Sequence, residues 1–113
     1  MRDDIPLEST ITAEIQRFLG RLPDWWGFKV QGSGSQMRGV PDIVGCYRGL
    51  FVAFEVKRPV VGRVSELQKH RIEQIKSAGG QAFVVYGVED VKQALAVLSS
   101  DVCTGGGGLA ICR

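Results

Sequence analysis

Near the N-terminus, apolar residues recur at helical spacing. The first helical pattern begins after Ser9 or Thr10, either of which is expected to cap it, and it ends at Gly20 and Pro23. Its apolar positions are Ile11, Ile15, Phe18, Leu19 and Leu22. An amphipathic helix with one face packed on a core is therefore predicted near the N-terminus.

Strand patterns follow the first helix. Residues 27–31 (GFKVQ) predict a short strand, and residues 32–39 (GSGSQMRG) predict a flexible polar loop. Residues 39–59 carry two apolar strands on either side of Arg48-Gly49, and residues 82–86 (AFVVY) have the composition of a buried strand.

Two more helices complete the pattern. Ser65 and Gln68 have the spacing of a capping box, and the helix that they open is expected to end at Gly79-Gly80. A third amphipathic helix is indicated by Val88, Val91, Leu95 and Leu98. The expected order is helix, three strands, helix, strand, helix, which is an α/β fold with a mixed central sheet flanked by helices.

Length and composition indicate one compact domain. The chain has 113 residues, of which 44% are hydrophobic and 23% charged. We expect a single domain over residues 1–100 and a glycine-rich tail over 101–113, where a short added strand at 109–112 is an alternative. The net charge of +2 is compatible with a polyanionic partner without arguing for one.

Cysteine usage and the N-terminus bear on the compartment. The three cysteines form no CxxC pair and leave one over, so neither a disulfide framework nor a zinc site is indicated. The chain begins with acids where a signal peptide has basic residues, and no apolar run approaches the ~20 residues of a membrane span. These features predict a soluble protein of the reducing cytoplasm.

The hairpin around Arg48-Gly49 carries charges inside its strands. If those two residues form the whole loop, Tyr47 faces Leu50, and Asp42 faces Glu55 five residues farther along. Facing carboxylates repel each other unless a cation compensates. Lys57 stands on the same side as Glu55. Arg-Gly is a poorer turn sequence than Asn-Gly, and a longer loop or a bulge would shift this register by one residue.

Glu14 is a candidate third carboxylate. It lies three residues after Ile11 and four before Phe18, on or beside the face of the helix that packs on the sheet. Three hard oxygen ligands suit magnesium or manganese. The alternative is that Glu14 sits at the edge of the apolar stripe and reaches solvent.

The hairpin motif resembles a known nuclease signature. Gly39-Val-Pro-Asp42, twelve intervening residues, and Glu55-Val-Lys57 look like the PD-(D/E)xK motif. With an acid on the preceding helix and Gln68 opening the next one, the pattern is similar to the VRR-NUC group of that superfamily. The resemblance implies a restriction-endonuclease-like core and hydrolysis of DNA phosphodiester bonds with Mg²⁺ or Mn²⁺.

The same resemblance implies the metal ligands. Asp42 and Glu55 would bind the metal directly, together with the main-chain carbonyl of Val56, while Glu14 would be an outer or water-mediated contact. Taken singly, Asp42 is also compatible with an ordinary turn acid, and Glu55 with a solvated strand position.

Two further side chains receive roles from the resemblance. Lys57 would orient or activate the attacking water and stabilise the charge that grows on the phosphate, and neighbouring carboxylates favour the charge-stabilising role. Gln68 would hold Lys57 or the water, although it is equally explained as the capping partner of Ser65. His70 is expected to face solvent, which argues against a histidine-based metal site.

Contacts to DNA are predicted from scattered features. The candidate DNA-binding residues are Lys29, Ser35, Arg38, Arg58, Arg63 and Lys69. A routinely charged surface with a mobile loop is the alternative. Of Trp25 and Trp26, one is expected in the core and the other on a surface that meets a partner or an unpaired base.

The size of the chain bears on the substrate. A domain this small reads little sequence, so cleavage directed by DNA structure is expected. Stand-alone VRR-NUC proteins, often encoded by phages, are similar to archaeal junction resolvases, which implies a homodimer acting on branched DNA in a bacterial or phage-infected cell. The alternatives are a flap, nick or non-specific nuclease and a nuclease-like binding module without catalysis. No membrane and no small-molecule cofactor is expected.

Overall fold

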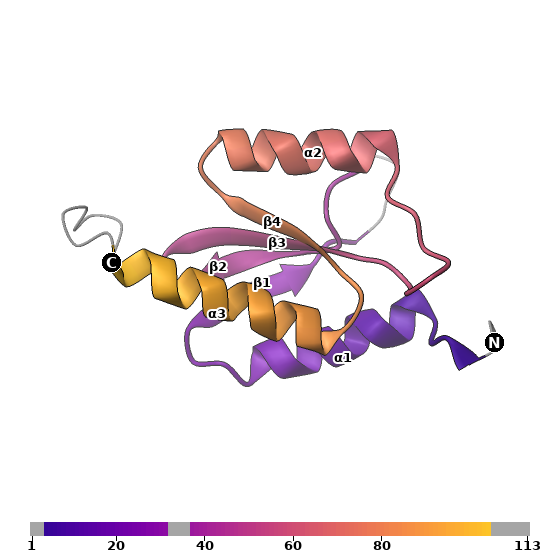
Figure 1. The fold of residues 1–113 in the computed structure, drawn as a ribbon, viewed down its shortest axis with the longest axis horizontal. Coiled ribbons are helices and arrows are strands. Elements are labelled where there is room, and N and C mark those ends of the chain that lie inside the picture. Colours follow the sequence, from indigo (N-terminus) through magenta and orange to yellow (C-terminus); the bar gives the residue numbers. More distant parts are fainter. Residues whose placement is uncertain (1–3, 32–36, 105–113) are drawn as a thin grey trace.

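The computed structural model describes residues 4–31 and 37–104. One mixed sheet lies between α2 on one face and α1 with α3 on the other (Figure 1). The elements in chain order are α1 (Glu8–Gly20), β1 (Trp25–Lys29), β2 (Ile43–Tyr47), β3 (Leu50–Val56), α2 (Glu66–Ser77), β4 (Gln81–Val85) and α3 (Val88–Thr104). The predicted fold class and order of elements are confirmed.

The four strands lie in the sheet in chain order, β1-β2-β3-β4. The first three pair antiparallel, whereas β4 pairs parallel to β3. A parallel neighbour requires a crossover connection, and α2 supplies it. This crossover brings α2 over the face of the sheet opposite to α1 and α3.

The loop between β2 and β3 is the two-residue turn that the sequence predicted. Arg48 and Gly49 both have left-handed φ values, 51° and 89°, which is the conformation of a type I′ hairpin turn. Tyr47 therefore pairs with Leu50, and the ladder runs without a bulge to Ile43 opposite Phe54. The register on which the predicted site depends is confirmed.

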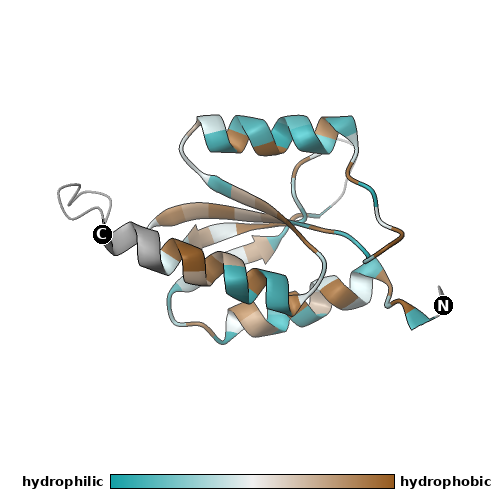
Figure 2. Cartoon of the chain, viewed as in Figure 1, coloured by the Kyte–Doolittle hydropathy of each residue, from teal (hydrophilic) through white to brown (hydrophobic). Residues whose placement is uncertain are grey.

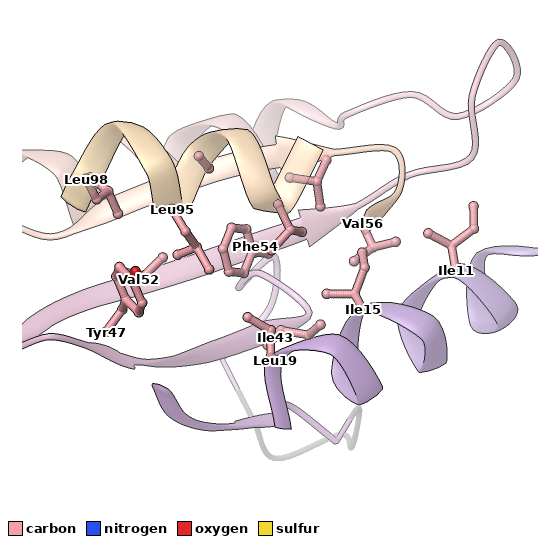
Figure 3. Close-up of a cluster of buried hydrophobic side chains, with 13 residues drawn as sticks. Ile11, Ile15, Leu19, Ile43, Tyr47, Val52, Phe54, Val56, Leu95 and Leu98 are labelled. Carbon is pink, nitrogen blue, oxygen red and sulfur yellow. The ribbon is translucent and has the colours of Figure 1, made fainter. Parts of the chain in front are cut away.

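The main core lies between the sheet and the α1–α3 layer (Figure 3). Phe54 is fully buried at its centre, and its ring lies 6.0 Å from Trp25 and 5.9 Å from Phe83 between centroids. A smaller cluster of Ala53, Ile72 and Ala82 lies under α2. Hydrophilic residues cover most of α2, while the strands are largely hydrophobic (Figure 2). Helix α2 thus meets the sheet through few apolar residues.

The N-terminal boundaries differ from the prediction. Helix α1 begins at Glu8, and Leu7 occupies the N-cap without a side-chain hydrogen bond, so the prediction of Ser9 or Thr10 as the cap is wrong. The preceding segment is held instead by Arg58, which donates to the carbonyls of Ile5 and Pro6. A tertiary contact, rather than a capping side chain, therefore holds the segment that leads into this helix.

Strand β1 and helix α3 also differ at their ends. The strand begins at Trp25, two residues earlier than predicted, because the Trp25 indole packs on Phe54 and its backbone pairs with Tyr47. Helix α3 continues to Thr104, past the predicted start of the tail at residue 101. The first strong helix-breaking residue after that point is Gly105. Residues 105–113, including the possible strand at 109–112, lie outside the described residues.

Within the described part of the chain, no helix has both the length and the apolar character needed to cross a membrane.

Core packing predicts a large and localised effect at Ile15, which is fully buried in the main core. Ile15→Ala is expected to lower the free energy of unfolding by roughly 2–5 kcal/mol, because the cavity cannot fully collapse. Gln16→Ala, on the exposed side of α1, is the control and should change it by less than about 0.5 kcal/mol. Urea denaturation of both variants measures the difference, and equal effects would contradict the assignment of the core face.

Candidate active site

The candidate site lies where β2 begins and β3 ends, on the α2 face of the sheet. Asp42 immediately precedes β2, and continuation of the hairpin register places it opposite Glu55. Phe54 points into the α1–α3 core, so Glu55, the next residue, points to the α2 side. Lys57 follows two residues later on the same side.

Asp42 is fixed by the backbone of both neighbouring strands. Its Oδ2 accepts a hydrogen bond of 2.8 Å from the Val56 main-chain N–H, and its carbonyl accepts one of 2.8 Å from the N–H of Val30. Pro41 before it is buried. The carboxylate therefore cannot swing into solvent without breaking a hydrogen bond, unlike an ordinary turn acid.

Glu55 is an acid inside the protein. The residue is 1% exposed, and its Oε2 accepts a hydrogen bond of 2.8 Å from Gln68 Nε2. Lys57 Nζ lies 3.5 Å from the same oxygen. Oε1 is buried and has no hydrogen-bond partner within residues 4–31 and 37–104. A buried carboxylate oxygen without a partner is costly unless a ligand binds it.

The electrostatics reflect this burial. Desolvation, and secondarily the nearby charge of Asp42, raise the pKa of Glu55 from 4.5 to about 8, although the Lys57 ammonium acts in the opposite direction. Near neutral pH, in the absence of a cation, this raised pKa favours the protonated form of Glu55. Such a displaced pKa in a pair of acids is typical of a functional site.

Gln68 forms the predicted capping box, and its side chain contacts Glu55 rather than Lys57. Its side-chain Oε1 accepts a hydrogen bond from the Ser65 main-chain N–H at 2.9 Å. Its main-chain N–H donates to Ser65 Oγ at 3.1 Å, which completes the capping box. Its Nε2 meanwhile donates to Glu55. The start of α2 is thus tied to the candidate site through a single side chain.

Glu14 is not brought to this pair. It is exposed and lines a surface hollow between α1 and α3 with Arg17, Phe18, Arg21, Val88 and Lys92. Within the described ranges, no group of three or more His, Cys, Asp or Glu side chains could hold a metal ion. The solvent-reaching alternative for Glu14 therefore describes the structure, since its position on the helix is off the line of buried residues.

A different acid of α1 lies on the buried line. Glu8 precedes the buried Ile11 and Thr12 by three and four residues, is half-buried, and accepts the Thr12 hydroxyl on its carbonyl at 2.9 Å. Arg58, which follows Lys57, donates hydrogen bonds to the carbonyls of Ile5 and Pro6 and so holds the segment just before Glu8. Sequence analysis missed Glu8 because the helix was expected to begin after it; helical spacing from Ile11, Ile15 and Leu19 extended backwards would have found it.

The predicted DNA-binding residues separate into three groups. Lys29, Arg38, Arg63 and Lys69 are exposed. Arg58 uses two of its donors on backbone carbonyls, which gives it a structural role. Ser35 lies outside the described residues. His70 is exposed on α2, as expected.

The two tryptophans divide as predicted between core and surface. Trp25 is half-buried against Phe54, while Trp26 is 72% exposed on the opposite face of β1. Phe28 lies beside Trp26, with ring centroids 5.9 Å apart at 75°.

Comparison with solved structures identifies the architecture. One match, described as a VRR_NUC domain, has a TM-score of 0.64 at 21% identity and covers 79% of this chain and 94% of the other. A second, described as a VRR_NUC domain protein, has a TM-score of 0.65 at 17% identity and covers 79% and 84%. The chain has the VRR-NUC fold. No family model and no curated protein matches the sequence.

The VRR-NUC fold gives this hairpin its context. The motif that suggested the resemblance, Asp42 and Glu55-Val-Lys57, lies at the end of the central strand pair, beside the N-terminus of α2. The fold thus agrees with the resemblance that the residues carried, although fewer than one residue in four is identical to either structure.

The raised pKa of Glu55 predicts how stability depends on pH in the absence of divalent cations. The pKa of about 8 in the folded state exceeds the ordinary value of 4.5, so the folded state holds the proton more tightly, and stability is lost as pH rises from about 4.5 to about 8. Glu55→Gln cannot ionise. In chelator it should match the wild type near pH 5 and exceed its unfolding free energy at pH 9 by roughly 2–4 kcal/mol.

Thermal and urea unfolding at the two pH values measure this difference. Glu73→Gln, an exposed acid on α2, is the control and should leave the pH profile unchanged. Addition of Mg²⁺ should stabilise the wild type and not Glu55→Gln. An equal offset between wild type and Glu55→Gln at pH 5 and pH 9 would contradict a charge buried in the folded state.

Proposed function

We propose that the protein is a metal-dependent DNA endonuclease that hydrolyses phosphodiester bonds. The observation that carries the proposal is the buried Glu55, with one oxygen unpartnered among the described residues, opposite Asp42 and 3.5 Å from the Lys57 ammonium. A protein that needed these residues for stability alone would gain by losing the repulsion between the acids.

The donor set fits a hard divalent cation. Mg²⁺ commonly takes one or two carboxylates and keeps several water molecules, so it does not require a third acid. Asp42 and Glu55 would hold it, with the Val56 carbonyl as a further ligand, and the unpartnered Oε1 of Glu55 would gain a partner. When bound, a Mg²⁺ or Mn²⁺ ion neutralises phosphate charge and lowers the pKa of water near it.

The side chains around the pair would then act on the substrate. The Lys57 ammonium can donate a hydrogen bond to a phosphate oxygen and stabilise the negative charge that grows there during attack. Gln68 positions Glu55 by donating a hydrogen bond to its Oε2. The other oxygen, Oε1, then has no hydrogen-bond partner among the described residues. Asp42 stays fixed in orientation because its Oδ2 accepts the Val56 N–H.

DNA is the substrate that the surroundings favour. Lys29, Arg38, Arg63 and Lys69 are exposed, and Arg38 lies in the segment that leads into Asp42. Exposed cations attract a phosphate backbone without supplying sequence readout. Lys69 is partly neutralised by Glu66, 3.2 Å away, which makes it the weakest of the four candidates.

Branched DNA is the proposed preference, with a Holliday-junction-resolvase-like activity of a homodimer. Two symmetric sites would suit a symmetric junction. A flap, nick or non-specific nuclease is the second candidate, and a DNA-binding module without catalysis is the third. The intact acid pair with Lys57 favours catalysis over simple binding.

Substitution of the acid pair should abolish cutting. Asp42→Asn keeps an oxygen that can accept the Val56 N–H, so the fold should survive while cleavage falls roughly 10²- to 10⁴-fold. Lys57→Ala should reduce cleavage by at least about 10²-fold. Lys92→Ala, which pairs with Glu89 on α3, is the charge-matched control and should cut like the wild type.

The measurement is a time course on labelled four-way junction, flap, nicked duplex and linear duplex with Mg²⁺, Mn²⁺ or chelator. Symmetric cuts confined to the junction would select the resolvase, and cuts at the flap or nick the second candidate. Binding of these substrates by the wild type without any cleavage would favour the third candidate, the DNA-binding module without catalysis.

The two acids of α1 provide a matched test of which of them belongs to the metal site. Glu8 lies on the buried line of the helix and Glu14 on its exposed side. In this proposal Glu8, rather than Glu14, is the outer metal contact, so Glu8→Gln is expected to reduce cleavage at least ~10-fold and to raise the Mg²⁺ concentration needed, because an added carboxylate strengthens cation binding. Glu14→Gln should leave both quantities unchanged. The reverse ranking, in variants of equal thermal stability, would restore Glu14 as the metal contact.

A further inference from the structure

The α2 face of the sheet is only partly covered. Helix α2 packs on β3 and β4 through Ile72 against Ala53 and Ala82. Beyond it, toward the β1 edge, two aromatic side chains remain exposed on the same face: Trp26 by 72% and Phe28 by 53%. Their rings meet edge to face, 5.9 Å apart between centroids.

This aromatic pair lies on the same face as the candidate active site. Phe28 pairs with Val44, two residues after Asp42, and Trp26 pairs with Cys46, two residues farther on. At about 3.4 Å per strand residue, the backbone positions of Phe28 and Trp26 are roughly 7 and 14 Å from Asp42 along the strand direction. A phosphate at Asp42 and Glu55 would therefore have the rings within one or two nucleotides of it.

Charge on this face is compatible with a polyanion. Apart from Asp42 and Glu55, the positions of the four strands that point to the α2 side carry no acid. Arg71 lies at the side of α2 in a hollow of about 240 Å³ whose wall includes Met37 and Val40, and its Nε donates to the Arg38 carbonyl at 2.8 Å. The Arg71 guanidinium thus stands between α2 and the segment leading to Asp42.

We propose that Trp26 and Phe28 form a stacking platform for unpaired bases next to the scissile phosphate. The substrate class is then DNA with a single-stranded segment beside the cut, which favours a flap over a fully paired four-way junction, and the inference rests on the proposed nuclease function of Asp42 and Glu55. Exposed aromatic rings stack on any base, because every base has a π-face, and a nearby cationic groove follows the backbone.

A second copy of the chain is a poorer occupant of this surface. The exposed parts of Trp26, Phe28 and the neighbouring Phe51, which is 46% exposed, amount to roughly 300–400 Å². A stable interface between proteins buries about 800 Å² on each partner. A few unpaired nucleotides match the smaller area.

Binding without catalysis tests the platform. In the Asp42→Asn background and in chelator, fluorescence anisotropy measures binding of labelled oligothymidylate of about 12 nucleotides and of the matching duplex. Trp26→Ala should weaken binding of the single strand by roughly 5- to 150-fold and Phe28→Ala by a smaller factor. Tyr86→Ala removes an aromatic ring that is 43% exposed beyond the end of β4, and it should leave binding unchanged.

The preference for DNA with unpaired nucleotides over continuous duplex supplies the second readout. In the wild-type background, Trp26→Ala should slow cleavage beside unpaired nucleotides more than cleavage of continuous duplex. Equal single-strand affinity of Trp26→Ala and its parent, in proteins of equal thermal stability, would overturn the platform. So would conversion of a dimer into a monomer by Trp26→Ala in sedimentation velocity, since the surface would then join two copies. Single-strand binding that depends on Trp26, without cutting of any substrate, would overturn the nuclease function and leave the platform standing.

Discussion

Two residues with left-handed backbone, Arg48 and Gly49, set the register of the hairpin that carries the candidate site. Because side chains alternate along a strand, a shift of one residue would send Glu55 to the opposite face and into the α1–α3 core. The turn is therefore the constraint on which the acid pair depends. The cost of a left-handed arginine is small beside the cost of that rearrangement, and the Arg48 N–H is held by the Asp24 carbonyl.

Burial makes the acid pair chemically useful and structurally costly at once. Glu55 is surrounded by protein, receives one hydrogen bond from Gln68, and has only Lys57 as a nearby counter-charge among the described residues. Its pKa of about 8 expresses that cost. A cation shared with Asp42 would remove it, so in our proposal the same interaction stabilises the fold and prepares the site for a phosphate.

The α2 helix connects the two halves of this arrangement. Gln68 caps the helix through Ser65 and holds Glu55 at the same time, so the helix cannot move along the sheet without disturbing the acid. Because α2 lies over β3 and β4, it also leaves the β1 side of that face open, where Trp26 and Phe28 are exposed. The platform proposed for unpaired bases follows from where the crossover helix lies.

Local rules in the sequence determined the hairpin register, the capping box at Ser65, the order of the elements and the facing of Asp42 with Glu55. Each of these depends on residues close together in the chain, where alternation and turn chemistry suffice. Tertiary structure decided the rest. Arg58 donates to the carbonyls of Ile5 and Pro6, distant in sequence, and so holds the segment that leads into α1. Helical spacing places Glu8 on the buried line once the helix is known to reach it, but local rules could not show that the helix begins at Glu8, because the N-cap Leu7 has no capping side chain.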